Sequence, residues 1–389
     1  MMFRKYGTYL IILLVVLVMI TVTLSLLITG ENKDEKAPDE NRITVIDAYG
    51  REIILDGPAE RIAYSHHSVS DSIRLIGAWD QVVGRDANVD DGHLFPGFEE
   101  IPVISQSMNA MDLNYEEIIE IHPDILILPK FDWYTGSEDI IQMLEPDIPV
   151  IFLDTLDPSP AVFNDTIKNL GIITGNEEKA TEYLDFYNGV YGMIVSKTSL
   201  IDPNDRPRLF FKAIGKTSPE QITTYGKEMP WFRNFIDAAG AKNIAEDLPI
   251  SYGDVDREWL LEQDIDVIVV KCWNDRYPGV FGYSVIDHED AIKGAEEIRT
   301  EIMGLDVFSN TDAVRNGNVY LFDDSMDATQ RNIIGIAYLA KWLYPEEFGD
   351  LDPEAVHQEY IGRFMEADYN LADSGIFAYP SQERGIVTE

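Results

Sequence analysis

Four basic side chains follow short apolar runs of the sequence that are expected to be strands of a parallel sheet. They are Arg85, Lys130, Lys212 and Lys271. Ligands of open parallel α/β sheets bind beyond the carboxyl ends of the strands, where charge-assisted hydrogen bonds orient an anion. These positions predict a locally positive cleft for an anionic ligand. The alternative for each is a side chain that reaches solvent or pairs with a nearby acid.

Aromatic side chains are concentrated in the same loops, and another strand end contributes an acid. The predicted ligand-binding set therefore also contains Phe131, Trp133, Tyr225, Tyr252, Trp273 and Asp324. Aromatic walls suit a large organic ligand better than a bare ion. Packing within the core is the alternative for each aromatic residue.

The adjacent histidines His66 and His67 complete the predicted ligand-binding set, because imidazoles at a strand end can also ligate a metal. However, adjacent side chains point to different sides, and no His-x-x-x-His pair or helically spaced carboxylate supports them. A satisfied or loop-exposed histidine pair is favoured over a metal site. We therefore predict no bound metal and no cofactor.

Catalytic motifs are absent from the sequence. There is no G-x-S-x-G elbow, P-loop, H-E-x-x-H or G-x-G-x-x-G pattern. Cys272 follows Lys271 at a strand end and could be a nucleophile, but a lone structural cysteine is the favoured interpretation. The sequence predicts that the protein is not an enzyme. The alternative is a two-lobed chelatase-like or hydrolytic enzyme that uses the many acids.

Short apolar runs alternate with amphipathic segments along most of the chain. Strands are expected at residues 61–64, 82–84, 102–104, 124–128 and 150–153, and again at 208–213, 222–225, 267–270 and 319–322. This alternation predicts an α/β fold with mainly parallel sheets. One long amphipathic stretch, residues 177–198, has no strand and no proline. It predicts two α/β lobes joined by one long helix.

A matched segment occurs once in each predicted lobe. The spacing from Asn114 to Glu116 to Asp124 equals the spacing from Asp256 to Glu258 to Asp266. Each segment opens with a good helix N-cap, places a glutamate in the first turn and leads into an apolar strand. Two lobes that share one plan explain this similarity.

Composition restricts the partners. The 389 residues carry 69 acidic against 30 basic side chains, a formal net charge of −39. Nucleic acid is excluded as a partner, because phosphate binding needs a surplus of Lys and Arg. A single cysteine allows no internal disulfide.

The beginning of the chain has the pattern of a targeting or membrane-anchoring segment. Residues 10–27 are uncharged and apolar, with Arg4 and Lys5 before them and an acidic stretch after them. This pattern predicts either an uncleaved membrane anchor or a removed signal, with the body outside the cytoplasm in both cases. The predicted organisation is a membrane anchor or signal at 1–30, a linker at 31–42, an N-terminal lobe at 43–160, a connecting helical segment at 161–200, a C-terminal lobe at 201–345 and an acidic, mostly helical extension at 346–389.

An ordered series of short motifs resembles one known family. The series is TVIDAYGRE (44–52), PAERIA (58–63), IGAWDQVVG (76–84) and NGNVYLFDD (316–324), together with the two matched segments and the long helix. It resembles the ABC-importer substrate-binding proteins of the ferric siderophore, haem and cobalamin class, over roughly residues 43–345. An uncleaved membrane anchor would depart from many bacterial members, as do the long aromatic loop 272–287 and the tail.

The resemblance implies a fold, a ligand class and partners. Members have two α/β lobes joined by a rigid helix, bind ligand between the lobes, and dock on basic residues of the permease through one glutamate on each lobe. Those glutamates match Glu116 and Glu258 here. The implied function is capture of an iron chelate or corrinoid, so that the ligand itself carries iron or cobalt, and delivery to an ABC permease and its ATPase at the outer face of the cytoplasmic membrane. An anchored ligand sensor without a permease is the other alternative.

Overall fold

The structure is a computed structural model that describes residues 41–89, 91–106, 112–131, 134–213, 221–273, 276–285, 287–327 and 329–381. Residues from Ile43 onward form one compact unit, which contains both lobes. Within these ranges no helix is long and apolar enough to cross a membrane. The apolar run at residues 10–27 and the predicted N-terminal helix lie outside the described residues.

The N-terminal lobe is built on a sheet of five parallel strands. In spatial order these are β5 (Val103–Ser105), β4 (Val82–Asp86), β3 (Ile62–Tyr64), β6 (Ile125–Pro129) and β7 (Val150–Leu153). The hairpin β1 (Ile43–Ile46) and β2 (Glu52–Leu55) precedes it, and the connecting helices are α2 (His67–Leu75), α3 (Tyr115–Ile121) and α4 (Ser137–Leu144). All five predicted strand positions of this lobe are confirmed to within two residues at each end. The helix α2 ends at Leu75, because Gly77 has a φ of +73° and turns the chain.

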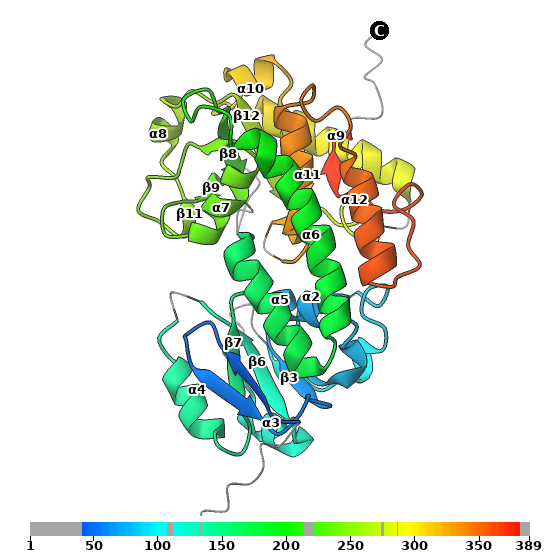
Figure 1. Cartoon of the computed structure of the whole chain (residues 1–389). Coiled ribbons are helices and arrows are strands. Elements are labelled where there is room, and N and C mark those ends of the chain that lie inside the picture. Colours follow the sequence, from blue (N-terminus) through cyan, green and yellow to red (C-terminus); the bar gives the residue numbers. More distant parts are fainter. Residues whose placement is uncertain are drawn as a thin grey trace, which may run out of the picture. The chain divides into compact units, whose positions relative to one another are not determined.

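Two antiparallel helices connect the lobes. They are α5 (Pro160–Thr174) and α6 (Glu177–Thr198), and α6 coincides with the predicted long helix. Figure 1 shows α6 running alongside elements of both lobes. Their contact is aromatic, since Phe163 of α5 stacks on Tyr187 of α6 with ring centroids 3.8 Å apart. The buried stack makes the connection between the lobes rigid.

The C-terminal lobe also contains a five-stranded sheet. In spatial order its strands are β10 (Lys242–Asn243), β8 (Arg208–Lys212), β12 (Val267–Cys272), β13 (Val319–Asp323) and β14 (Ala378–Tyr379), of which only β14 is antiparallel. The helices are α7 (Pro230–Ala238), α8 (Arg257–Leu261), α9 (His288–Gly304), α10 (Asp312–Arg315) and α11 (Asn332–Leu343). The segment predicted as a strand at 222–225 lies outside this sheet. It forms β9 (Thr223–Tyr225), which pairs antiparallel with β11 (Tyr252–Asp254).

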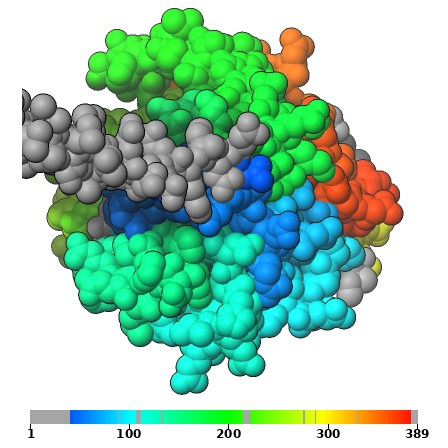
Figure 2. Space-filling view, turned by 60° about the horizontal axis from the view of Figure 1, so that its bottom comes forward, coloured from blue at the N-terminus to red at the C-terminus, as the bar shows by residue number. Residues whose placement is uncertain are grey.

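The tail packs on the connecting helix and closes the C-terminal sheet. It contains α12 (Pro353–Glu359), the π-helical turn η4 (Tyr360–Phe364) and the edge strand β14. Figure 2 shows the orange-to-red tail against the green surface of α6. Tyr183 of α6 meets the Phe364 ring edge-on at 5.0 Å, and Arg363 pairs with Glu182.

The two lobes share one plan, as the internal repeat predicts. The strand order β4-β3-β6-β7 of one lobe corresponds to β10-β8-β12-β13 of the other. In the first lobe the Asp124 carboxylate accepts the backbone N–H of Arg61 at 2.9 Å. In the second, Asp266 accepts the backbone N–H of Arg208 at the same distance. Each of these aspartates therefore ties the start of its strand to the neighbouring strand.

Candidate functional site

Several predicted residues of the N-terminal lobe meet at the carboxyl edge of its sheet. The backbone N–H of Ser65 bonds to Ile127 at 3.1 Å, and that of Lys130 bonds to Leu153 at 2.8 Å. These register contacts bring the residues after β3, β6 and β7 together. Phe131 consequently meets His66 edge-on, with ring centroids 5.2 Å apart.

His66 is held in a strained conformation at this edge. Its φ is +80°, which is unusual for a residue with a side chain and costs about 1–3 kcal/mol. Nδ1 lies 2.7 Å from the Ser68 hydroxyl, which in turn lies 2.6 Å from the Thr155 hydroxyl. Burial lowers the pKa of His66 well below its usual value, so the ring is neutral.

His67 links the two lobes electrostatically. Its ring packs on His66 with centroids 4.1 Å apart. Burial, together with the charges of Lys271 and Arg331 from the C-terminal lobe, lowers its pKa to about 4. Because two cations of one lobe act on a histidine of the other, the carboxyl edges of the two sheets face one another here. We call this region the interlobe site, which contains His66, His67, Lys130, Phe131, Tyr225, Tyr252, Lys271 and Asp324.

Lys271 is the central cation on the C-terminal side of the interlobe site. Its Nζ lies 2.7 Å and 3.0 Å from the two oxygens of Asp327, which is fully buried. The same Nζ lies 6.0 Å from the centre of the Tyr225 ring, and Tyr225 meets Tyr252 with centroids 5.4 Å apart. Lys271 is therefore positioned by an acid and lies beside the Tyr225 ring, which in turn packs on Tyr252.

Further acids surround these cations. Lys130 lies 3.8 Å from Asp154. Burial and the neighbouring Asp323 raise the pKa of Asp324 to about 7. Lys130 and Lys271 each face a carboxylate, so the described residues do not form the locally positive cleft predicted from the sequence. A chain with 69 acids places them beside its few bases.

A buried polar layer joins the lobes beneath the interlobe site. Arg331 donates a hydrogen bond of 2.8 Å to Asp71 of α2, and both side chains are almost completely buried. The Gln330 amide reaches the Thr155 carbonyl at 3.2 Å, and Tyr187 of α6 donates to Asn332 at 2.9 Å. These contacts fix the lobes against each other.

Two of the predicted basic residues lie elsewhere. Arg85 donates from Nε to the Phe98 carbonyl at 2.7 Å and from Nη1 to the Asp86 carbonyl at 2.8 Å, so it holds a loop. Lys212 lies on the same face of the sheet as Phe210 and Cys272, opposite to the face that carries Lys271. Lys212 and Lys271 both lie at strand ends, as predicted, but the pleat of the sheet places their side chains on opposite faces.

The remaining predicted residues are placed as follows. Trp273 is half-buried, and its carbonyl accepts the backbone N–H groups of Arg276 and Tyr277 at 2.9 Å. Trp133 lies outside the described residues.

Glu116 on α3 and Glu258 on α8 are exposed in the first turns of their helices. Burial raises the pKa of the Cys272 thiol, which makes it a poor nucleophile.

Sequence reasoning missed Asp71, Arg331 and Asp327. Asp71 lies four residues after His67 on the same side of α2, and its side chain is buried. A buried charge needs a partner, but no local pattern identifies a partner 260 residues away. Asp327 similarly comes from the loop after β13.

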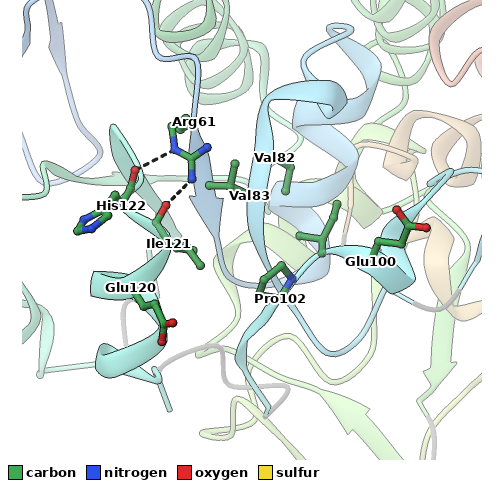
Figure 3. A pocket seen from close by; sticks show the side chains of 9 residues that line it. Arg61, Val82, Val83, Glu100, Pro102, Glu120, Ile121 and His122 are labelled. Atoms are coloured by element: carbon green, nitrogen blue, oxygen red, sulfur yellow. Dashed lines mark hydrogen bonds between the residues drawn. The ribbon is translucent and has the colours of Figure 1, made fainter.

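A cavity lies at the amino ends of the strands of the N-terminal sheet, away from the interlobe site. It has a volume of about 580 Å³ and is lined by residues at the amino ends of β3 and β4 and the end of α3. Figure 3 shows Glu100 and Glu120 on opposite sides of it, and Arg61 bonded to the carbonyls of Ile121 and His122. Arg61 already donates to those two carbonyls. Ligands of parallel α/β sheets bind at the carboxyl ends of the strands, whereas this cavity lies at the amino ends, so we do not regard it as the ligand site. Among the described residues no group of three or more His, Cys, Asp or Glu could hold a metal ion.

Comparison with known proteins agrees with this architecture. The family model described as "Periplasmic binding protein" matches residues 62–326. The molybdate-binding protein MolA of Haemophilus influenzae is 21% identical over 353 residues, which cover 85% of this chain and 90% of that protein. Among solved structures, the TroA-like periplasmic binding protein FepB from Veillonella parvula has a TM-score of 0.72 and 23% identity, covering 86% of this chain and 99% of FepB. A periplasmic haem-binding protein from Pseudomonas aeruginosa has a TM-score of 0.53 and 17% identity, covering 74% and 94%.

These findings define the class and then the family. The two-lobed α/β fold with a rigid connecting helix is that of ABC-importer binding proteins of the siderophore, haem and cobalamin class. The chain belongs to the periplasmic binding protein family, whose members are extracytoplasmic solute-binding components of ABC transporters.

Proposed function

We propose that this protein captures a metal-bearing organic chelate, either an iron chelate of the siderophore type or a corrinoid, at the interlobe site and delivers it to an ABC permease. The proposal depends above all on one observation. Burial lowers the pKa of His67 in the N-terminal lobe to about 4, and the charges of Lys271 and Arg331 in the C-terminal lobe add to this shift, while Arg331 bonds directly to Asp71 of the N-terminal lobe at 2.8 Å. Groups from both lobes can therefore contact one ligand.

The aromatic lining supports an organic ligand. Phe131 packs edge-on against His66 in the N-terminal lobe, and Tyr225 packs against Tyr252 in the C-terminal lobe. Large rings contribute dispersion and apolar burial over a wide surface. The pairs Lys130–Asp154 and Lys271–Asp327 supply charges that orient polar substituents of the chelate.

Delivery requires a membrane partner. We propose that Glu116 and Glu258, exposed on corresponding helices of the two lobes, dock on basic residues of the permease. Residues 1–30 would hold the protein at the outer face of the cytoplasmic membrane, or be removed from a secreted protein. The protein would need no cofactor of its own, since the ligand brings the iron or cobalt.

A titration tests ligand capture. The purified full chain in detergent is titrated with ferric catecholate and hydroxamate chelates, haem and cobalamin, following tryptophan and tyrosine fluorescence. We expect one class to bind with a submicromolar Kd, and the variant F131A/Y252A to bind it at least tenfold more weakly. The exposed variant M143A serves as the control. Absence of binding to every chelate would overturn the proposal.

An oxyanion is the second candidate. It is favoured by the two cations, Lys271 and Arg331, that act on His67, and by the similarity to a protein that binds molybdate. Molybdate is therefore included in the titration. Molybdate binding that survives F131A/Y252A, without binding of any chelate, would support this candidate instead.

A further inference from the structure

The matched helices of the two lobes correspond residue by residue in their burial. Ile118 of α3 and Leu260 of α8 are the inward-facing residues, with exposed fractions of 0% and 1%. The next residues, Ile119 and Leu261, are 53% and 55% exposed. Glu120 and Glu262, which follow them, are also exposed. The correspondence therefore extends from the sequence to the surface that each helix presents.

Each helix presents one aliphatic side chain beside two carboxylates. Glu116, Ile119 and Glu120 are separated by three and four residues, which places them on one side of a helical turn. Glu258, Leu261 and Glu262 have the same spacing, and Glu262 retains helical backbone angles. We call these two sets the paired patches. No hydrogen bond or ion pair joins the side chains of these four glutamates to another residue in the described ranges.

Both patches are held firmly on their lobes. Asn114 caps α3 by accepting the backbone N–H of Glu117 at 3.2 Å. Asp256 caps α8 by accepting the backbone N–H groups of Glu258 and Trp259 at 2.7 and 3.0 Å. Because each helix is capped and leads into a central strand, the patches keep a fixed geometry.

Exposure of these two aliphatic residues is notable because few large apolar side chains are exposed. Eight are exposed in the described part of the chain, and two of them occupy corresponding positions of the repeat. A single exposed leucine needs no explanation. A matched pair, each flanked by unpaired carboxylates, fits a partner that itself has two equivalent subunits.

We propose that Ile119 and Leu261 are apolar contacts through which the paired patches dock on a dimeric permease, whose subunits each offer an apolar hollow bordered by Arg or Lys. This inference rests on the proposed function and adds contacts beyond Glu116 and Glu258. The partner is basic because the four carboxylates require complementary charge, and twofold because the patches are duplicated. Apolar burial at the centre of a charged rim gives such an interface its affinity.

The test uses I119S/L261S, which removes both apolar contacts without changing charge. The probe is the permease–ATPase complex of the same organism whose ATP hydrolysis the wild-type protein stimulates, reconstituted in lipid nanodiscs. We expect the double variant to bind this complex at least tenfold more weakly, with single variants intermediate, while its Kd for the chelate and its Tm stay unchanged. The control is L200S, since Leu200 is 85% exposed but lies outside both patches.

The outcomes separate the two proposals. Binding of I119S/L261S to the complex within twofold of wild type overturns the inference. If E116K/E258K then still weakens docking, the proposed function stands without the apolar contacts. If no such complex responds to the wild-type protein, or if E116K/E258K also has no effect, docking itself is refuted and delivery to a permease falls with it.

Discussion

Arg331, just before α11, and Asp71, in the middle of α2, form a buried ion pair at 2.8 Å that joins the two lobes. Arg331 also lies 5.4 Å from the centre of the Tyr283 ring. Removing two charges from water is costly. Attraction within the pair offsets this cost only because the two groups are well oriented for a hydrogen bond. It fixes how the two edges that form the interlobe site face each other.

The first prediction concerns this pair. D71N leaves Arg331 buried without a full counter-charge, and we expect the free energy of unfolding to fall by about 3–5 kcal/mol. The double variant D71L/R331M should recover part of the loss, because it removes both charges together. Urea denaturation of the wild type, D71L, R331M and D71L/R331M measures the coupling. A loss in the double variant equal to the sum of the two single losses would show that the two residues do not stabilise each other.

The second prediction separates the two lysines of the interlobe site. K130M breaks a partly exposed pair, so stability should change by less than about 1 kcal/mol, whereas affinity for an anionic chelate should fall about tenfold. K271M leaves Asp327 buried and unpaired, so the protein should lose about 3–5 kcal/mol. Thermal unfolding and ligand titration of both variants check this. Comparable stability of K130M and K271M would contradict it.

The third prediction is a pH dependence of ligand binding. Asp324 has a pKa of about 7, raised by burial and by Asp323, while Lys271 and Arg331 act in the opposite direction. As pH rises from 6 to 8, its carboxylate becomes charged near Lys271, and affinity for an anionic chelate should decrease several-fold. D324N should remove this decrease.

The raised pKa of Asp324 should also make the stability of the protein depend on pH. The folded pKa lies above the value of about 3.9 for an unfolded aspartate, so the native state binds more protons between pH 4 and 7. Asp324 therefore contributes stability at low pH that is lost as pH rises through 7. Denaturant titrations at pH 5 and 8 should show a smaller difference for D324N than for the wild type; an unchanged difference would argue against this titration.

The fourth prediction concerns Lys212, which is 2% exposed. Burial lowers its pKa to about 8. Between pH 8 and about 10.5 the unfolded chain binds the extra proton, so stability should rise with pH in this range. K212M should remove that rise and increase stability at pH 7 by on the order of 2 kcal/mol, because a buried charge is replaced by a similar apolar side chain.

Chemical denaturation from pH 7 to 10.5 measures the effect, with exposed K227M as the matched control. A K212M protein that is less stable than wild type, with an unchanged pH profile, would mean that Lys212 is stabilised by a partner.

The fold was predictable from the sequence because its elements are encoded locally. The apolar run at 150–153 and the amphipathic stretch at 177–198 coincide with β7 and α6. The matched spacing around Glu116 and Glu258 likewise predicted a shared plan, since caps and strand lengths depend on nearby residues.

The chemistry of the site was less predictable, because it depends on residues far apart in sequence. Lys271 was correctly placed at a strand end, but its partner Asp327 comes from a loop 56 residues later. The opposite faces of Lys212 and Lys271 depend on the register between β8 and β12, which neither strand specifies alone. The sequence pattern therefore predicted which residues lie at the strand ends, but not which acidic side chains pair with the lysines there.

The strand β14 has a consequence for biogenesis. It pairs with β13 through Leu321 and Phe322, although more than 50 residues separate the two strands. Until the chain has emerged through Tyr379, the edge of β13 stays open and can recruit strands from neighbouring molecules. Synthesis and export must therefore run almost to the end of the described chain before this lobe is protected from aggregation.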